Sequence, residues 1–333
     1  MTIIMQNYAL YKIIFSKNNQ KELFDEDKNR KQIDEALTQL ETILGGDLLF
    51  IRKTKREEED YDRLEHSIEA RRDHVVLMML KNNKRKRYME GREERDLKYH
   101  PGCYIIFDLR QGVAQVAIER ISAFDNEPDR VNKILTQTLN NALQPFGLCL
   151  EIRPKMREGK FWEVIDEQRN VFQDEVKSIV FELPKKNAMG PTDKSYQDSY
   201  NQEQNANFKG FMAYARKEKK CKFAWYGDED DPVKLDHLDE DVAVLVGFCC
   251  SNGYAMHVRF NNYGLYRFGD KIRAYEQLDD KIVTAFIVGQ EEMFSQKWSL
   301  FTWLDKARQR SQNLEESKNL RNETTECPTE IEA

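Results

Sequence analysis

A dense group of cations with tyrosines among them lies between residues 81 and 100. Eight Lys and Arg residues stand against four acidic residues here, and the tyrosines are Tyr88 and Tyr99. The cations are Lys81, Lys84, Arg85, Lys86, Arg87, Arg92, Arg95 and Lys98. Flexible cations can neutralise phosphates and tyrosine can stack on an unpaired base, so the segment predicts contact with nucleic acid. The alternative is a solvated, charged hairpin tip with local ion pairs.

The triplet Glu175-Val176-Lys177 lies just before an apolar segment, residues 178–183, and suggests a different chemistry. Nucleases that use a divalent metal need an upstream Asp and such a triplet, because the carboxylates bind the cation and the lysine steadies charge. Asp166 or Asp174 would be the upstream acid. Such triplets arise often by chance in a chain with 33% charged residues. A nuclease is therefore the alternative, and convergence of these carboxylates is its geometric test.

Two small groups of possible zinc ligands also occur, His100 with Cys103, and Cys249 and Cys250 with His257. Zinc needs four such groups in tetrahedral geometry. The cysteines lie in or beside apolar segments, where free Cys acts as a small hydrophobe, so we expect no metal and no cofactor. The chain has no phosphate-binding glycine loop, nucleophile elbow, kinase signature or HExxH motif. These observations favour a protein without enzymatic activity.

Two further segments have simpler interpretations. Residues 259–273 (RFNNYGLYRFGDKIR) alternate aromatic residues with Arg267 and Lys271. The segment is a second candidate surface for nucleic acid, but the pattern is more often that of an ordinary sheet with one buried face and one face in water. The acidic run at residues 228–241 lacks the spacing of an EF-hand and is interpreted as a solvated linker.

Composition limits where such a protein can act. The 333 residues are 40% apolar, enough for a substantial core, and the net charge of −6 argues against nucleic-acid affinity over the whole surface. The first residues lack the features of a signal peptide, and the longest apolar runs are too short to cross a bilayer. Six scattered cysteines fit reduced thiols. We expect a cytoplasmic protein without membrane insertion.

Helices and strands that would position these residues are mixed along the first half of the chain. Strands are predicted from β-branched and aromatic runs at residues 8–15, 48–51, 75–80, 103–109, 113–118, 148–152 and 176–183. Helices are predicted at residues 33–44, 57–72, 129–143 and 159–169. The basic segment itself reads as a loop that ends at Pro101-Gly102.

The second half begins after a stretch poor in apolar residues, 188–207, which we interpret as a linker. Helices are predicted beyond it at residues 208–215 and 291–314, and strands at residues 242–248, 255–260, 264–268 and 281–288. Strands that follow one another directly favour an α+β fold of two lobes, with mixed or antiparallel sheets flanked by helices. The predicted domains are residues 1–187 and 208–314, with a disordered tail at residues 315–333.

One region, residues 134–187, contains a strand that ends in I-x-P-K at Ile152 to Lys155, then a helix, and then the pattern V-x-x-I-x-F at Val176 to Phe181. This arrangement resembles the core of the lambdoid Rex exclusion sensor and a group of uncharacterised bacterial proteins associated with phage defence. The resemblance covers about a sixth of the chain. It implies a DNA-binding sensor that triggers a downstream effector, with Arg153, Lys155 and Lys177 as cations near the shared strands. Arg153-Pro154-Lys155 could equally be a strand end that the proline holds extended.

The preferred hypothesis is a non-enzymatic, DNA-binding sensor or effector component of a bacterial anti-phage defence system, acting with a partner protein. The residues assigned to nucleic acid are Lys84, Arg85, Lys86, Arg87, Arg92, Arg95, Arg153 and Lys155. The metal-dependent nuclease is the first alternative. A third hypothesis is a protein–protein adaptor that docks through helix 291–314, with Phe294, Trp298 and Phe301 exposed in the isolated chain.

Overall fold

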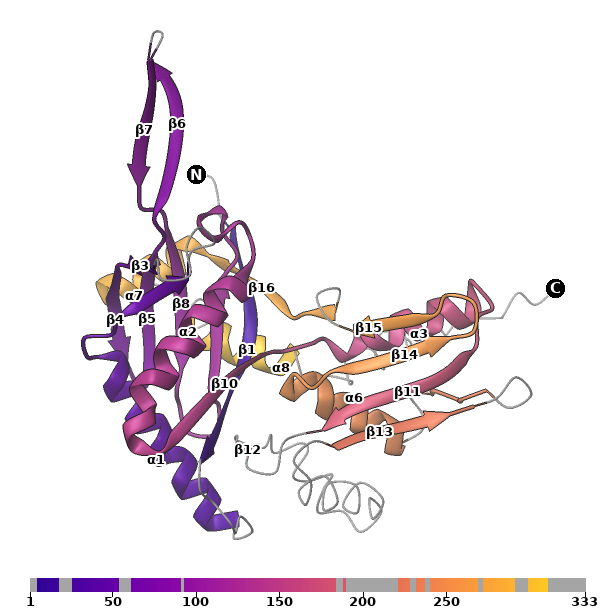
Figure 1. Ribbon diagram of the computed structural model, residues 1–333. Helices are drawn as coiled ribbons and strands as arrows, with labels where there is room; N and C mark the ends of the chain where they lie inside the picture. The colour runs from indigo at the N-terminus through magenta and orange to yellow at the C-terminus, as the bar shows by residue number, and fades with distance from the viewer. Residues whose placement is uncertain are drawn as a thin grey trace, which may run out of the picture.

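The chain forms two lobes, each built on an antiparallel sheet with flanking helices, so the predicted α+β class is confirmed (Figure 1). The computed structural model describes residues 5–17, 26–53, 61–90, 93–183, 188–189, 221–227, 232–236, 240–268, 272–290 and 299–310. Among these residues, no helix is both long and apolar enough to cross a membrane.

The first lobe contains an eight-stranded sheet whose main order is β10-β1-β9-β8-β5-β4. These strands are β1 (Met5–Lys17), β4 (His66–Arg72), β5 (Val75–Lys81), β8 (Gly102–Asp108), β9 (Gln115–Glu119) and β10 (Leu148–Pro154). The long strand β1 organises the sheet, because it also pairs with β12 (Ala188–Met189) and β16 (Tyr275–Asp279). One strand near the N-terminus thus joins segments from most of the chain.

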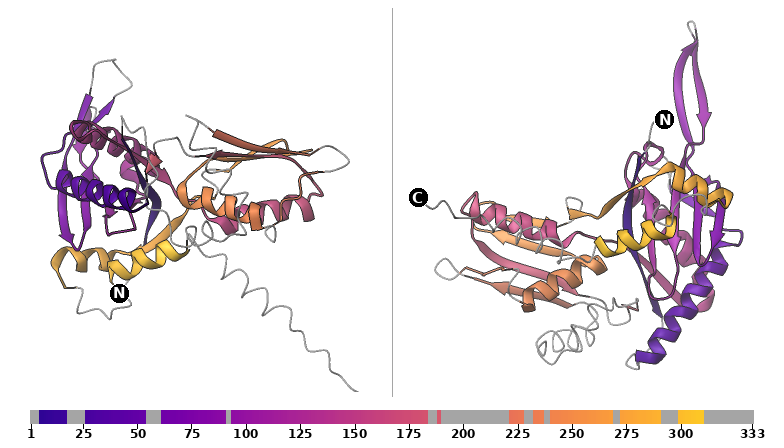
Figure 2. Two further views of the ribbon diagram at one scale, coloured as in Figure 1. Left: turned by 90° about the horizontal axis from the view of Figure 1, so that it is seen from below. Right: turned by 180° about the vertical axis from the view of Figure 1, so that it is seen from behind.

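Helices cover both faces of this sheet. One face packs against α1 (Glu26–Leu44) and α2 (Pro128–Leu143), and the other packs against α7 (Asp280–Val288) and α8 (Leu300–Arg310) (Figure 2). Successive residues of β1 alternate accordingly, so that Tyr11 faces α2 and Leu10 faces α8. Burial on both faces explains why β5 is almost continuously apolar and why all five residues of β9 are buried.

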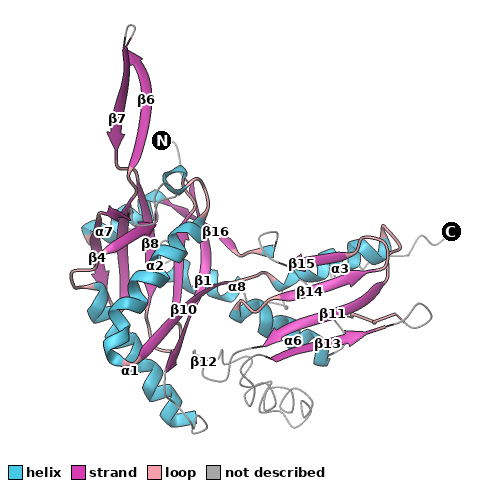
Figure 3. Cartoon of the chain, in the orientation of Figure 1, coloured by secondary structure: helices cyan, strands magenta, loops and turns pink. Residues whose placement is uncertain are grey.

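The second lobe is smaller and has helices on one side of its sheet (Figure 3). Its strand order is β13-β11-β14-β15, with β13 (Cys221–Tyr226), β11 (Val176–Leu183), β14 (Met256–Phe260) and β15 (Leu265–Phe268). The covering helices are α3 (Glu158–Asn170) and α6 (Glu240–Asn252). Phe161 of α3, Phe181 of β11 and Phe260 of β14 are fully buried between these layers.

The chain enters the second lobe after β10 and returns to the first lobe at β16. The two crossing segments lie side by side: Lys155 donates its N–H to Leu10 O at 2.8 Å, Ala274 donates to Lys155 O at 2.9 Å, and Met156 forms a β-bridge with Arg273. Thus α3 and β11 belong to the second lobe, whereas β16, α7 and α8 belong to the first. The division between the sheets therefore does not follow the expected linker at residues 188–207.

Most predicted elements are confirmed. These are the strands at residues 8–15, 75–80, 103–109, 113–118, 148–152, 176–183, 255–260 and 264–268, and the helices at residues 33–44, 129–143 and 159–169. The predicted strand at 48–51 is shifted to β2 (Phe50–Lys53), and α8 forms the described part of the helix predicted at 291–314. The predicted helix at 208–215 and the predicted tail at 315–333 lie outside the described residues, as does most of the predicted linker.

The helix predicted at residues 57–72 is wrong. The described part of this segment forms β3 (Tyr61–Leu64), which pairs with β2, and the edge strand β4, which pairs with β5. Its many charges misled the prediction, because they resemble the solvated face of a helix. An edge strand tolerates the same charges, since one of its sides meets water.

The strands predicted at residues 242–248 and 281–288 are also wrong, because both segments are helical, in α6 and α7. A continuous apolar run does not distinguish a buried strand from a buried helix. Residues 245–250 of α6 are all buried, which accounts for that run. Local signals mark α7 instead: the Asp279 carboxylate accepts from Lys281 N at 3.0 Å, and Gly289 ends the helix with φ +76°.

Candidate functional site

The basic segment is a two-stranded ribbon that extends out of the first lobe (Figure 1). Its strands, β6 (Lys84–Glu90) and β7 (Glu93–Tyr99), continue the register of β5 and β8: Lys81 pairs with Gly102, and Lys84 pairs with Tyr99. The loop predicted here is therefore wrong. The segment is the outer half of one long hairpin whose inner half lies in the core.

Short side-chain contacts fix the root of the ribbon, where the ladder is interrupted. Asn82 donates its N–H to Pro101 O at 2.9 Å, but Pro101 has no N–H to donate in return. The buried Asn82 amide also donates to Ala123 O at 2.6 Å. Asn83 donates to Arg63 O at 2.9 Å on the neighbouring strand β3. These amides hold the start of the ribbon against the lobe.

Lys84 is part of this root. Its ammonium donates to Asp125 Oδ1 at 3.0 Å and to Ser122 O, and only 24% of its side chain is exposed. The hydrogen bond from Lys84 lowers the pKa of the Asp125 carboxyl. Lys84, which the sequence assigned to phosphate, thus lies in an internal ion pair.

Beyond the root, the two strands of the ribbon pair in register, with Arg85 opposite Lys98, Lys86 opposite Leu97 and Arg87 opposite Asp96. Tyr99 is 40% exposed and Leu97 is 51% exposed. Acidic residues concentrate toward the tip, where Glu90 pairs with Glu93; Arg92 lies outside the described residues. Between the root and the tip, both strands of the ribbon therefore contribute cationic residues.

Arg153 lies at the crossing between the lobes. Its Nε donates to Glu151 Oε2 at 3.0 Å, and its guanidinium stacks 4.5 Å from the centre of the Tyr254 ring. Its side chain is only 17% exposed. Arg153 therefore joins β10 to the second lobe and is not on the ribbon.

Lys155 lies inside the first lobe, with 6% of its surface exposed. Its ammonium donates to Gln115 Oε1 at 2.9 Å, and Gln115 donates to Asp108 Oδ2 at 3.1 Å. Arg110 binds Asp108 through two bonds of 2.8 Å and also reaches Asp305 of α8 at 2.8 Å. This polar chain fastens α8 to the sheet and leaves Lys155 away from any nucleic-acid surface.

The carboxylates proposed for a nuclease do not converge. Asp174 is 2% exposed and accepts from Asn262 N at 2.9 Å and from Tyr263 N at 2.7 Å, so both of its oxygens hold the turn between β14 and β15. Glu175 and Lys177 point to solvent as exposed residues. Within the described ranges, no group of three or more His, Cys, Asp or Glu is placed to hold a metal ion.

The helix proposed for an adaptor covers its own sheet where it is described. Leu300, Leu304 and Ala307 of α8 are buried against the first sheet, and Phe301 packs beside them. Phe294 and Trp298 lie outside the described residues. The described apolar side of α8 is therefore not available to a partner.

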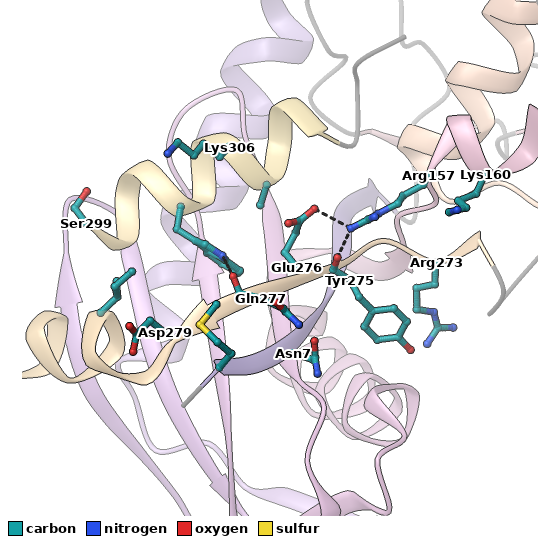
Figure 4. Close-up of a pocket in the computed structure, with 14 residues that line it drawn as sticks. Asn7, Arg157, Lys160, Arg273, Tyr275, Glu276, Gln277, Asp279, Ser299 and Lys306 are labelled. Carbon is teal, nitrogen blue, oxygen red and sulfur yellow. Dashed lines mark hydrogen bonds and ion pairs between the residues drawn. The ribbon is translucent and has the colours of Figure 1, made fainter. Parts of the chain in front are cut away.

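A pocket of about 600 Å³ lies at the junction of β1, β16, α8 and the start of α3 (Figure 4). Its charged lining residues are Arg157, Lys160, Arg273, Glu276, Asp279 and Lys306. Most of the cations already have protein partners: Arg157 bonds Glu276 at 3.1 Å, Arg273 bonds Asp129 at 2.7 Å, and Lys160 bonds Glu163. The pocket has room for a small anion, but most of its cations already form ion pairs within the protein. No sequence signal marked it, because its lining comes from four distant segments.

Comparison of the chain with protein-family models, with curated proteins and with solved structures gives no match.

Proposed function

We propose that this protein is a non-enzymatic nucleic-acid-binding protein that holds duplex DNA through phosphate contacts along the ribbon β6–β7. The observation that supports this proposal is the continuous register from β5 and β8 into the ribbon. The inner half of the hairpin is packed in the core, so the outer half can project cations from a fixed base. A two-stranded ribbon also has a width that the major groove of B-DNA accepts.

Charge supports the same proposal. The whole chain has a net charge of −6, so attraction to phosphate must be local. Beyond the root, the strands of the ribbon carry Arg85, Lys86, Arg87, Arg95 and Lys98. Phosphate contacts of this kind give affinity and position without reading sequence. The proposal is therefore binding with little base preference.

The biological setting that we propose is a cytoplasmic sensor or effector component of bacterial defence against phage, working with a partner protein. It rests on the resemblance of residues 134–187 described above. Within that stretch, Arg153 and Lys155 make internal contacts. The shared stretch would therefore position the two lobes, while the ribbon outside it binds DNA.

Binding of the full chain to a labelled duplex of about 20 base pairs across a salt series tests this proposal. The variant Arg85→Ala/Lys86→Ala/Arg87→Ala leaves the root intact. We expect the slope of log affinity against log salt to fall by about 0.9 for each lost phosphate contact, or about 3 in all. The charge control is Lys31→Ala/Lys133→Ala, which removes two exposed cations from α1 and α2.

An unchanged slope in the ribbon variant, or no duplex binding at low salt, would overturn the proposal. The series is repeated with magnesium. If the duplex is cleaved, the nuclease hypothesis would replace the hypothesis of a non-enzymatic binding protein.

A further inference from the structure

The second sheet has a face that α3 and α6 do not cover, which we term the open sheet face (Figure 2). Paired residues run across this face in rows: Tyr226, Ser178, Arg259 and Leu265 form one row over all four strands. His257 and Arg267 pair in the next row. The neighbours of these residues along each strand, such as Phe260 and Phe268, point into the core. The alternation expected for residues 259–273 is thus confirmed, and its wet side forms this face.

Large side chains on the open sheet face are exposed. Tyr226 on the edge strand β13 is 78% exposed, and Leu265 on the opposite edge is 46% exposed. Arg259 on the inner strand β14 and Arg267 on the edge strand β15 are exposed as well. An aromatic ring, an apolar side chain and two guanidinium groups therefore share one uncovered surface.

The charges on this face are not balanced. Its acidic residue, Glu182, is engaged by Lys222 and lies 3.8 Å from His257. No ion pair joins Arg259 or Arg267 to a residue that the structure describes. On an ordinary wet face, opposite charges in neighbouring strands pair with each other. Here the arginines lie diagonally on β14 and β15, about 7–8 Å apart at the backbone, and can meet neighbouring phosphates.

We propose that the open sheet face binds single-stranded nucleic acid. Arg259 and Arg267 contact phosphates, and the Tyr226 ring stacks on a base. A single strand is the favoured ligand because its base faces are accessible, whereas a duplex hides them in its own stack. The inference deepens the proposed function by adding a second ligand class, and it rests on residues that the ribbon does not share.

Anisotropy of a labelled oligothymidylate of about 12 nucleotides, with the full chain across a salt series, tests the inference. Arg259→Ala/Arg267→Ala should reduce the salt slope by about 1.4, which is the value for two phosphates of a single strand. Tyr226→Ala should weaken binding at least about fivefold, and Tyr226→Phe should restore it because the ring remains. Lys31→Ala/Lys133→Ala is again the charge control, and circular dichroism checks folding.

The same variants are then measured on the blunt duplex. The inference holds if the open-face variants weaken single-strand binding alone and the ribbon variant weakens duplex binding. It is overturned if the open-face variants match the charge control on the oligothymidylate, or if they change only self-association in sedimentation, which would mark a protein contact. Single-strand binding that depends on Tyr226, without any duplex binding, would sink the ribbon proposal and leave this one standing.

Discussion

Lys155 and Lys84 both hold their ammonium groups against protein acceptors, at 2.9 Å from Gln115 Oε1 and 3.0 Å from Asp125 Oδ1. The sequence assigned both residues to phosphate contacts, Lys84 because it lies in the basic segment and Lys155 because it lies in the stretch that resembles the phage-defence proteins. Burial indicates a structural role for Lys155, which is 6% exposed, whereas Lys84 is 24% exposed and its role follows from its contacts with Asp125 and Ser122. A buried ammonium with an acceptor stabilises the fold, and removing it leaves that acceptor unpaired.

Lys155→Met should therefore lower the stability of the protein and leave its DNA binding unchanged. The substitution keeps the length of the side chain but leaves Gln115 Oε1 without this donor. We expect the free energy of unfolding in urea to fall by about 1–3 kcal/mol. The salt slope for duplex binding should stay at the wild-type value. A reduced slope with unchanged stability would instead make Lys155 a phosphate contact.

Glu158 at the start of α3 is 6% exposed and accepts from Trp162 Nε1 at 3.3 Å. Burial raises the pKa of Glu158 from 4.5 to about 7. The folded protein thus holds this proton more tightly than the unfolded chain does. Its contribution to stability is complete below about pH 4.5 and is lost as pH rises through about 7.

Glu158→Gln should remove that part of the pH dependence. Between about pH 5 and pH 8 we expect the wild-type free energy of unfolding to fall by roughly 3 kcal/mol, and the variant to stay nearly constant over the same range. Urea titrations followed by tryptophan fluorescence measure both. Glu167→Gln, an exposed position in the same helix, is the control. Parallel pH profiles for wild type and Glu158→Gln would contradict the assignment.

At the scale of elements, the ribbon is separable from the lobe that carries it. Its strands pair with each other, and its described attachments are at the root, through Asn82, Asn83 and Lys84. The core strands β5 and β8 are paired independently of it. Binding and folding therefore depend on different halves of one hairpin.

Replacing residues 85–98 with Asn-Gly should shorten the hairpin to a two-residue turn. We expect a free energy of unfolding within about 0.5 kcal/mol of wild type, because no core contact is removed. Duplex binding should be lost. Thermal unfolding and fluorescence anisotropy measure the two properties. A shortened protein that still binds duplex with the wild-type salt slope would show that the phosphate contacts lie elsewhere.

Local sequence patterns predicted those helices and strands whose formation depends on local features of the sequence. The apolar stripe of α2 and the β-branched run of β1 each follow from the burial of one element, and both are confirmed. Helices α6 and α7 were missed because each contains a continuous apolar run, which does not show whether a segment is a helix or a strand. Asp279 and Gly289 are the capping signals that could have identified α7.

The site was predictable in part. Sequence located the basic segment, but its extended form depends on pairing with β5 and β8, which no local pattern shows. A charged hairpin tip was the alternative interpretation of this segment, and the matching interruptions at Asn82-Asn83 and His100-Pro101 are a signal that could have favoured it. The internal roles of Arg153 and Lys155 depend on Tyr254 and Gln115, which are distant in sequence.

At the scale of the whole molecule, the second lobe begins and ends at neighbouring points of the first. Arg157 donates its N–H to Ile272 O at 2.7 Å, and Met156 bridges Arg273. The strands and helices on either side of this junction complete the first sheet and cover it. Of the residues between, the first sheet takes only the two-residue strand β12 among those described, so the first lobe can close the rest of its core without this segment.

A chain in which Gly-Ser replaces residues 158–271 tests this. We expect it to unfold cooperatively, at a lower temperature than wild type because the contacts of Arg153 with Tyr254 are lost. It should keep duplex binding through the ribbon and lose binding of the oligothymidylate. Calorimetry and the two binding assays measure these properties. An excised chain that aggregates or unfolds without a transition would mean that the lobes fold as one unit.

The two chain segments that connect the lobes lie next to each other, and this arrangement has an evolutionary consequence. A segment whose ends meet can be gained, lost or exchanged in one event without interrupting the sheet that receives it. Selection can then act at different rates on the first lobe and on the inserted segment. Descendants would keep the first sheet and its ribbon but carry a different segment between residues 157 and 272.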